Sequence, residues 1–587
     1  MGKAKTEPKP QLLRWSDHVP ASEVQDPLGL GLRGSTRLAS LLLYCITSIT
    51  PRARYFSFIP WSVSDFQLHE KGQSHALGLR EAIAVRQRAH TLACIIHHEG
   101  EGCTGPGLNG VREGKKWYAK SESSADLKKI KLTKNSVLNA YYTSLVNLGC
   151  FVSEQDRLET EEEIEDSEFT FDDIELSELG LELANAYGSL VGRLGAVKNL
   201  SEIDRRCSVS SLTELGKRGG LCELVDPSSP DRDLLRDVFF ARKGFTEKSH
   251  FRRNRSLSLI LELCRQFSAS NWPTDAFSFG SGVYYGQLVD EDDGTVEVSI
   301  PQPLADIATR WKMFYFHHFM SVALEGMFSW LVTQLNGRGV SGATLGDLVR
   351  ELDSPLVTRS LSELLGEDLS SAFGSTSPSE FFSCLGVRSS TFDDALSQQI
   401  DEVITAQHSV AEIYLESTIR SRTFLQSPTG LAIPAILFAL TLGRYRRWES
   451  SEYGNWLASD AVVKDPYLDL LPSTASLALV RHQGDWWNQP WRMLTEYLLS
   501  RFVVQQHQSM SYEKTATGDR CLLQVDGQKI VADSPYEKIG LGNPRLESAI
   551  QVLSDLALIL TDENGVAHLT KDGQQLLKKE LERGGEA

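Results

Sequence analysis

The stretch from Asn543 to Leu577 constrains the fold more than any other part of the chain. Behind Pro544, which suits a first helical turn, apolar residues recur at the spacing of one helix face: Leu546, Ala549, Ile550, Leu553 and Leu556. The apolar segment 558–560 then leads into the turn sequence 562–565, and 566–569 returns as a second strand. Thr570 is placed to cap a last helix whose apolar residues are Leu576, Leu577 and Leu581. The sequence therefore predicts a helix, a two-stranded hairpin and a second helix.

The same order of elements recurs between residues 137 and 190. An apolar helical stripe ends before Gly149, which suits a C-cap, and consists of Val137, Leu138, Tyr141, Leu145 and Leu148. Residues 150–152 predict a strand, 169–176 its return, and Ser177 the cap of a leucine-rich helix. The segment LSELG at 176–180 matches LTKDG at 569–573. Helix, two-stranded wing and helix outline a winged-helix domain. We therefore expect a mainly α fold with small β-wings, in which two winged-helix modules flank a large helical body.

The length of 587 residues suits roughly three or four domains of about 150 residues each. Alternation around Asp526 and Gly527 adds a second hairpin signal. The expected order is an N-terminal helical segment (1–112), a winged helix with an acidic wing (113–192), a helical middle region with a β-hairpin near 277–300 (193–502), a β-hairpin (503–534) and the C-terminal winged helix (535–587).

Several features predict a cytoplasmic protein without membrane contact. The longest apolar run, Leu431 to Leu442, contains Pro434 and is shorter than the roughly 20 residues that span a bilayer. The first ten residues lack the apolar core of a secretory signal. Nine cysteines without a CxxC pair fit reduced thiols better than a disulfide framework.

Two basic clusters are the candidate contacts to double-stranded DNA. The net charge of −17 excludes a protein that coats nucleic acid, so any contact must be local. The first cluster comprises Lys115, Lys116, Lys128, Lys129, Lys131 and Lys134. The second comprises Arg242, Lys243, Lys248, Arg252, Arg253 and Arg255, beside two phenylalanines. Both suit neutralisation of backbone phosphates. A solvated surface is the alternative for the first cluster, and salt bridges to a partner are the alternative for the second.

The wing of the first module predicts a protein partner. Residues 154–168 are strongly acidic and include Glu161, Glu162 and Glu163, which DNA phosphates would repel. A basic protein surface would attract them, and a loop kept soluble by its charge is the alternative. The final helix of the C-terminal module has nearly balanced charges, which also favours a protein partner. There we assign partner binding to Leu558, Leu560 and Leu576.

Two other segments have residue types found in binding sites. Arg52 and Arg54 stand among the aromatics of 55–61, where they could grip a nucleic acid, although we favour a packed segment with paired arginines. Zinc-binding residue types occur at Cys94, His97, His98 and Cys103, but no second ligand pair follows at the usual spacing. We therefore assign neither metal nor cofactor.

The sequence lacks the local signatures of common enzymes. It contains no GxSxG elbow, HExxH pair or Walker loop, because the segment from Gly110 to Lys116 departs from the phosphate-loop spacing. We predict a non-enzymatic protein. A nuclease or another enzyme whose site is assembled from distant residues remains an alternative, as does a stand-alone winged-helix DNA-binding regulator.

The order of modules resembles a known class of subunits. Terminal winged helices, here at 132–191 and 543–577, joined by a middle region are similar to the kleisin-type and accessory subunits of SMC-like ATPases, including bacterial defence complexes of the Wadjet and Lamassu kind. The compact, tryptophan-containing middle departs from the flexible linker of kleisins. The resemblance implies a scaffold subunit that bridges an SMC-like ATPase and an effector nuclease in antiphage or anti-plasmid defence.

Overall fold

The computed structural model divides the chain into two compact units. The module unit lies within 35–318 and 542–587, and the middle unit lies within 1–34, 319–450 and 471–541. These units cut across the expected domain boundaries, because the C-terminal module joins a unit that begins near the N-terminus. The structure describes residues 26–73, 77–101, 107–132, 137–152, 174–202, 204–242, 245, 248–289, 295–365, 368–384, 411–421, 423–450, 471–482, 484–514, 521–532, 534, 536 and 545–583.

The module unit is mainly helical. Its helices are α1 (Thr36–Leu42), α2 (Tyr55–His69), α3 (Leu79–His97), α4 (Val111–Tyr118), α5 (Val137–Asn147), α7 (Glu178–Val191), α8 (Gly195–Leu200), α9 (Val209–Gly219), η3 (Leu221–Val225), α10 (Pro230–Phe239), α11 (Lys248–Ala269), α12 (Ala276–Tyr285), η4 (Gln302–Leu304), α24 (Leu546–Asp555) and α25 (Lys571–Arg583). Its antiparallel strand pairs are β1 (Ser124–Asp126) with β2 (Arg206–Ser208), β3 (Gln287–Val289) with β4 (Thr295–Glu297), and β7 (Ile559–Thr561) with β8 (Ala567–Leu569). The expected mainly α fold with small strand pairs is confirmed.

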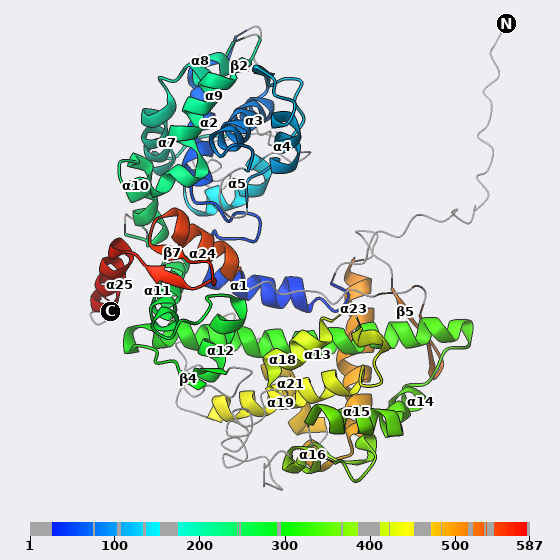
Figure 1. Cartoon of the computed structure of the whole chain (residues 1–587). Coiled ribbons are helices and arrows are strands. Elements are labelled where there is room, and N and C mark those ends of the chain that lie inside the picture. The colour runs from blue at the N-terminus through cyan, green and yellow to red at the C-terminus, as the bar shows by residue number, and fades with distance from the viewer. Residues whose placement is uncertain are drawn as a thin grey trace, which may run out of the picture. The chain divides into compact units, whose positions relative to one another are not determined.

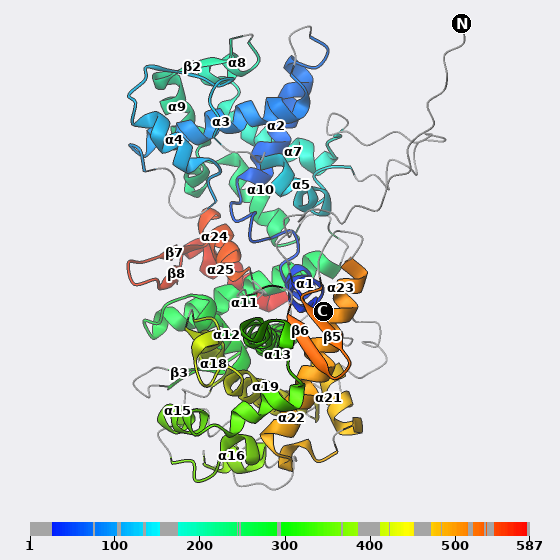
Figure 2. The same cartoon turned by 90° about the vertical axis from the view of Figure 1, so that its right-hand side faces the viewer.

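The C-terminal module has the predicted helix, hairpin and helix. In both views α24, β7, β8 and α25 lie beside α11 (Figures 1 and 2). The side chain of Asp562 fixes the turn, since its Oδ1 accepts the backbone N–H groups of Asn564 and Val566, both at 2.9 Å. Gly565 supplies the positive φ of 79° that the turn requires. Local sequence chemistry therefore determines this hairpin.

The helices α24 and α5 end in the same way. The chain leaves α24 through Ala557 and α5 through Gly149, each in a left-handed conformation. The backbone N–H of Leu558 donates to the carbonyl five residues earlier at 3.0 Å, and that of Cys150 does the same at 2.9 Å. These are the bonds of a Schellman-type helix end. Phe151 and Leu176 then form an antiparallel bridge in the first copy.

The helices α25 and α7 also begin in the same way. The Thr570 hydroxyl accepts the backbone N–H of Gly573, and the Ser177 hydroxyl accepts that of Gly180, both at 3.0 Å. Each hydroxyl thereby satisfies an otherwise unpaired donor of the first helical turn. The similarity of 176–180 and 569–573 thus extends to their hydrogen bonds. The acidic wing expected at 154–168 lies outside the described residues.

The aromatic segment around α2 is the core of the module unit, as the preferred interpretation predicted. Arg52 and Arg54 are buried beside it. The Nη2 of Arg52 lies 2.9 Å from Asp555 Oδ1 on α24, and the Nη2 of Arg54 lies 3.2 Å from Asp231 Oδ1 on α10. Burial raises the pKa of the Asp555 carboxyl, while the Arg52 charge opposes this shift. The two arginines therefore tie the C-terminal module and α10 to the N-terminal helices.

The expected hairpin near 277–300 is shorter than predicted. Residues 276–285 form α12 instead of a strand, because the Asp275 side chain caps the helix by accepting the backbone N–H of Ser278 at 2.8 Å. Gly280 and Gly282 leave room for aromatic side chains of neighbouring helices. The alternation of apolar and small residues imitated a strand here. The hairpin itself is β3 with β4.

The described part of the middle unit combines helices of different lengths with one hairpin. Its elements are η5 (Gly339–Ser341), α14 (Leu345–Val349), η6 (Arg350–Asp353), α15 (Pro355–Leu365), η7 (Phe373–Ser375), α16 (Pro378–Cys384), α18 (Glu412–Ile419), η9 (Phe424–Gln426), α19 (Ala432–Ser450), α21 (Leu471–His482), η10 (Trp486–Asn488), α22 (Trp491–Leu498), η11 (Leu499–Val504), α23 (Gln505–Lys514), β5 (Leu523–Asp526) and β6 (Lys529–Ala532). The hairpin turns at Asp526 and Gly527 as predicted, but 503–514 is helical. The residues of η1 (Gly31–Ser35) and α13 (Ala305–Arg338) are divided between the units. Among the described helices, none has the length and apolarity needed to cross a membrane.

Candidate functional site

The first basic cluster lies on the surface of the module unit. Lys115 and Lys116 are exposed on α4, and Lys128, Lys129 and Lys131 are exposed after β1, whereas Lys134 lies outside the described residues. Three of these lysines have acidic neighbours, at 3.0 Å for Lys115, 2.8 Å for Lys116 and 3.2 Å for Lys129. Exposed ion pairs of this kind contribute little free energy, so the ammonium groups remain able to turn towards a phosphate.

The second basic cluster is divided between the interior and the surface, and for Arg253 this corrects the expectation of a DNA contact. Arg253 is fully buried, and its guanidinium donates to the carbonyls of Phe239 at 3.0 Å and Val238 at 2.7 Å. Burial lowers the pKa of Arg253. Arg242 forms a 3.0 Å ion pair with Glu580 of α25, and Arg255 donates to the carbonyl of the same residue at 3.3 Å. These arginines position the C-terminal helix.

The remaining positions of this cluster, and the neighbouring His250, have different environments. Burial and the nearby Arg253 charge lower the pKa of His250 to about 4, so this imidazole is neutral at pH 7. Lys248 is exposed and Arg252 is half-buried. Lys243 lies outside the described residues. Lys115 to Lys131 is therefore the more accessible basic surface.

The residues assigned to partner binding have different environments. Leu558 and Leu576 are buried inside the C-terminal module, which corrects their assignment as surface contacts, since neither side chain can reach a partner in this fold. Leu560 of β7 is 62% exposed. Glu161, Glu162 and Glu163 lie outside the described residues. Leu560 is thus the accessible member of the predicted apolar set.

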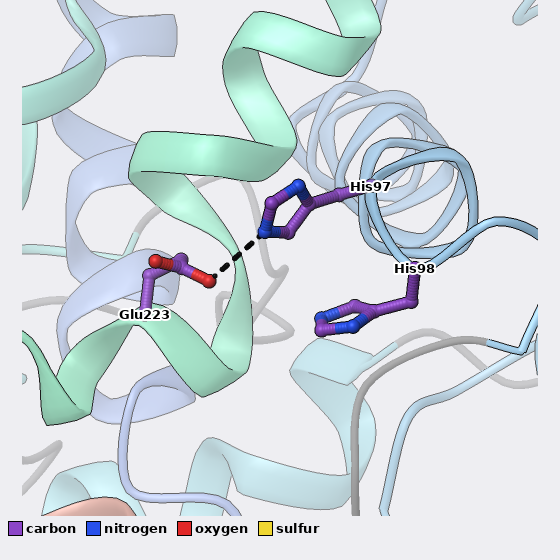
Figure 3. A group of neighbouring side chains, drawn as sticks. All are labelled: His97, His98 and Glu223. Atoms are coloured by element: carbon purple, nitrogen blue, oxygen red, sulfur yellow. Dashed lines mark hydrogen bonds and ion pairs between the residues drawn. The ribbon is translucent and has the colours of Figure 1, made fainter.

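The cysteine and histidine segment forms a different cluster from the one that its sequence suggests. Cys94 is fully buried within α3, and Cys103 lies outside the described residues. Figure 3 shows His97 and His98 at the end of α3 facing Glu223, and ligand atoms of these three residues lie within 4.8 Å of one another. The His97 Nε2 lies 3.1 Å from Glu223 Oε1. The preceding residue, Cys222, places its Sγ 2.8 Å from His98 Nε2.

Sequence reasoning missed Cys222 and Glu223 because they lie on η3, more than 120 positions after the histidines. Zinc motifs are recognised by short spacings between ligand pairs, and the adjacent pairs here have no such spacing. The sequence offered one signal for these residues. Cys222 and Glu223 are adjacent potential ligands that follow the glycine pair at the end of a predicted helix. The packing of α3 against α9 brings the two segments together.

Comparison with known proteins gives no relative. No family model, curated protein or solved structure matches the chain.

Proposed function

We propose that the chain is a non-enzymatic, DNA-associated accessory subunit of a bacterial antiphage or anti-plasmid defence complex, in which it bridges an SMC-like ATPase and an effector nuclease. The order of its modules, which resembles that of such subunits, supports this proposal. One observation carries it furthest: the C-terminal module keeps its first helix inside the fold and leaves its wing exposed. That arrangement suits docking of a protein on the wing.

The helix before the wing is unsuited to reading DNA bases. In helix-turn-helix proteins, recognition requires a helix whose exposed side chains enter the major groove. Among the ten residues of α24, only Glu547 is exposed, and a carboxylate is repelled by phosphates. Asp555 at the end of α24 is bound by Arg52 inside the core. These features argue against a stand-alone regulator and favour a module that binds protein.

The wing offers a contact of the required kind. Leu560 is paired with His568 in the hairpin and projects its side chain to solvent. The hairpin is anchored on its other side, because Thr274 donates its backbone N–H to the Gly565 carbonyl at 2.9 Å. A short, anchored hairpin with an exposed leucine can present that side chain to an apolar pocket without ordering a loop, which lowers the entropic cost of binding.

The DNA contact is tested by reversing exposed charges. Replacing Lys115, Lys116, Lys128 and Lys129 with glutamate is expected to weaken retention of the chain on double-stranded DNA at least tenfold at low salt. Because fewer counterions are then released, the logarithm of the binding constant should also depend less steeply on salt. Binding of the purified chain to labelled DNA at a series of salt concentrations measures both effects.

A charge-matched control separates the local contact from general repulsion. Arg193, Lys198, Lys217 and Arg218 are also exposed in the module unit. Their joint reversal to glutamate changes the net charge by the same amount and should weaken binding much less. Equal losses of DNA affinity in the two variants would show that binding depends only on the net charge of the chain. This result would contradict the proposed DNA-binding surface.

A further inference from the structure

We propose that His97, His98, Cys222 and Glu223 bind one zinc ion. Figure 3 shows the two imidazoles and the carboxylate directed into the same space between α3 and η3. The separations are 3.1 Å for His97 Nε2 to Glu223 Oε1, 2.8 Å for His98 Nε2 to Cys222 Sγ, and 3.6 Å for Cys222 Sγ to Glu223 Oε1. The ligand atoms of the two histidines and the carboxylate lie within 4.8 Å of one another, and the Cys222 Sγ, which contacts His98 and Glu223, completes the set after a side-chain rotation.

These separations are close to those of a tetrahedral site. Bonds of about 2.0–2.3 Å from zinc to nitrogen, oxygen and sulfur place neighbouring ligand atoms about 3.3–3.8 Å apart. His98 Nε2 and Cys222 Sγ, now 2.8 Å apart, need to separate by about 0.5–1.0 Å, which side-chain rotation provides. The hydrogen bonds between these groups would then be replaced by bonds to the ion.

The local backbone explains how two pairs of sequence neighbours can converge. Successive side chains of an α-helix point about 100° apart and do not face one ligand. His97 is the last residue of α3, however, and His98 leaves the helix with φ of −99° and ψ of 28°. The next residue, Glu99, has φ of 52°. Cys222 and Glu223 lie on the tighter 3-10 turn of η3.

The backbone before Cys222 is fixed from both sides. The Tyr187 hydroxyl donates to the Gly219 carbonyl at 3.0 Å, and the buried Arg54 Nη1 donates to the Gly220 carbonyl at 2.6 Å. At Gly216 of α9, a Cβ would approach the backbone of α3 to less than 3.0 Å, so the two helices are in close contact one turn before the site. The four donors are therefore held on rigid elements, as a metal site requires.

The donor set selects the ion. Two imidazoles, a thiolate and a carboxylate suit zinc, whereas calcium and magnesium require six or more oxygen ligands. Binding converts the Cys222 thiol to a thiolate and releases its proton to solvent, so affinity falls as pH is lowered. The side chains of His97 and Glu223 are 24% and 26% exposed, which gives the ion a path from solvent. Bound zinc would link α3 to η3.

The first test measures zinc in the purified, untagged, full-length chain. After removal of loosely bound metal, elemental analysis should find about one zinc per chain, as expected for a preformed four-ligand site. Replacing zinc with Co²⁺ should give the visible absorption of a tetrahedral site and a near-ultraviolet thiolate-to-cobalt band. Chelation of zinc should lower the melting temperature of the chain, and zinc but not Mg²⁺ should restore it.

Single substitutions identify the ligands. Cys222→Ser should abolish the thiolate band, and His98→Asn should reduce zinc retention at least tenfold. Matched controls are Cys384→Ser and His482→Asn, at exposed positions of the middle unit, which should retain both signals. Loss of zinc in Cys222→Ser and His98→Asn, but not in Cys384→Ser and His482→Asn, supports the proposed site. If either variant fails to fold, the Co²⁺ spectrum of the unsubstituted chain shows whether a thiolate binds the metal. A chain without retained zinc or a thiolate band, or a folded Cys222→Ser variant that keeps the band, overturns the proposal.

Discussion

Replacing Asp231 with alanine is expected to lower the free energy of unfolding of the module unit by about 3–5 kcal/mol. The Asp231 carboxylate accepts from the Nε and Nη2 of Arg54, both at 3.2 Å, and from the hydroxyls of Ser57 at 2.7 Å and Ser229 at 2.8 Å. Arg54 and Asp231 are both 0% exposed. Without the carboxylate, the guanidinium would remain buried without its counter-charge, and this uncompensated burial is the main cost.

Asp233→Ala is a matched control on the same helix. The Asp233 side chain is 75% exposed and lies near Arg236 at the surface, so its loss should cost no more than about 0.5 kcal/mol. Urea unfolding, with hydrogen exchange of the α2 and α10 amides as a local probe, distinguishes the variants. The double substitution Arg54→Met with Asp231→Leu should be more stable than Asp231→Ala, because no isolated charge remains. Equal unfolding midpoints for Asp231→Ala and Asp233→Ala would refute this account of the core.

The second large effect is expected from Gly573→Ala and Gly180→Ala, at about 3 kcal/mol or more for each. In both modules a Cβ at this position would lie less than 3.0 Å from a backbone carbonyl oxygen, that of Leu558 or Cys150. Backbone atoms cannot rotate away as a flexible side chain can. The first turn of the following helix would therefore have to separate from the residue that closes the preceding helix.

Gly195→Ala is the corresponding control. Gly195 is the first residue of α8, and apart from the adjacent backbone no atom lies within 4 Å of the position that its Cβ would take. The substitution should be neutral or stabilise the chain by up to about 1 kcal/mol, because alanine has less conformational freedom in the unfolded state. Thermal unfolding of the three variants gives the comparison. If Gly573→Ala or Gly180→Ala has the same melting temperature as Gly195→Ala, the shared packing of the two modules is disproved.

The sequence predicted those features that depend on neighbouring residues. The α24–β7–β8–α25 order follows from a helical repeat, a turn fixed by Asp562 and Gly565, and a cap at Thr570, all of which act within a few residues. Ser177 and the resemblance of 176–180 to 569–573 predicted the second copy for the same reason. Local hydrogen bonds and the periodicity of apolar residues can be predicted without knowledge of tertiary contacts.

Features set by distant contacts were not predictable in this way. Arg253 belongs to a basic run in the sequence, yet the packing of α11 buries it against the carbonyls at the end of α10. Arg242 meets Glu580, which is 338 positions away. His97 likewise meets Glu223 across 126 positions. The sequence of a basic run or a histidine pair is the same whether its side chains face solvent, a carboxylate or a metal. Only the folded structure distinguishes these environments.

The most direct test of the proposed function is purification of the chain and its variants from the native host, with mass spectrometry of the bound proteins. The unsubstituted chain should recover an SMC-like ATPase and a nuclease. Leu560→Asp should lose at least one of these partners, because a carboxylate in an apolar interface is costly to desolvate. Leu68→Asp, at a leucine that is 76% exposed, should keep both partners. Recovery of the unsubstituted chain alone, or both partners retained equally by Leu560→Asp, would contradict the proposal.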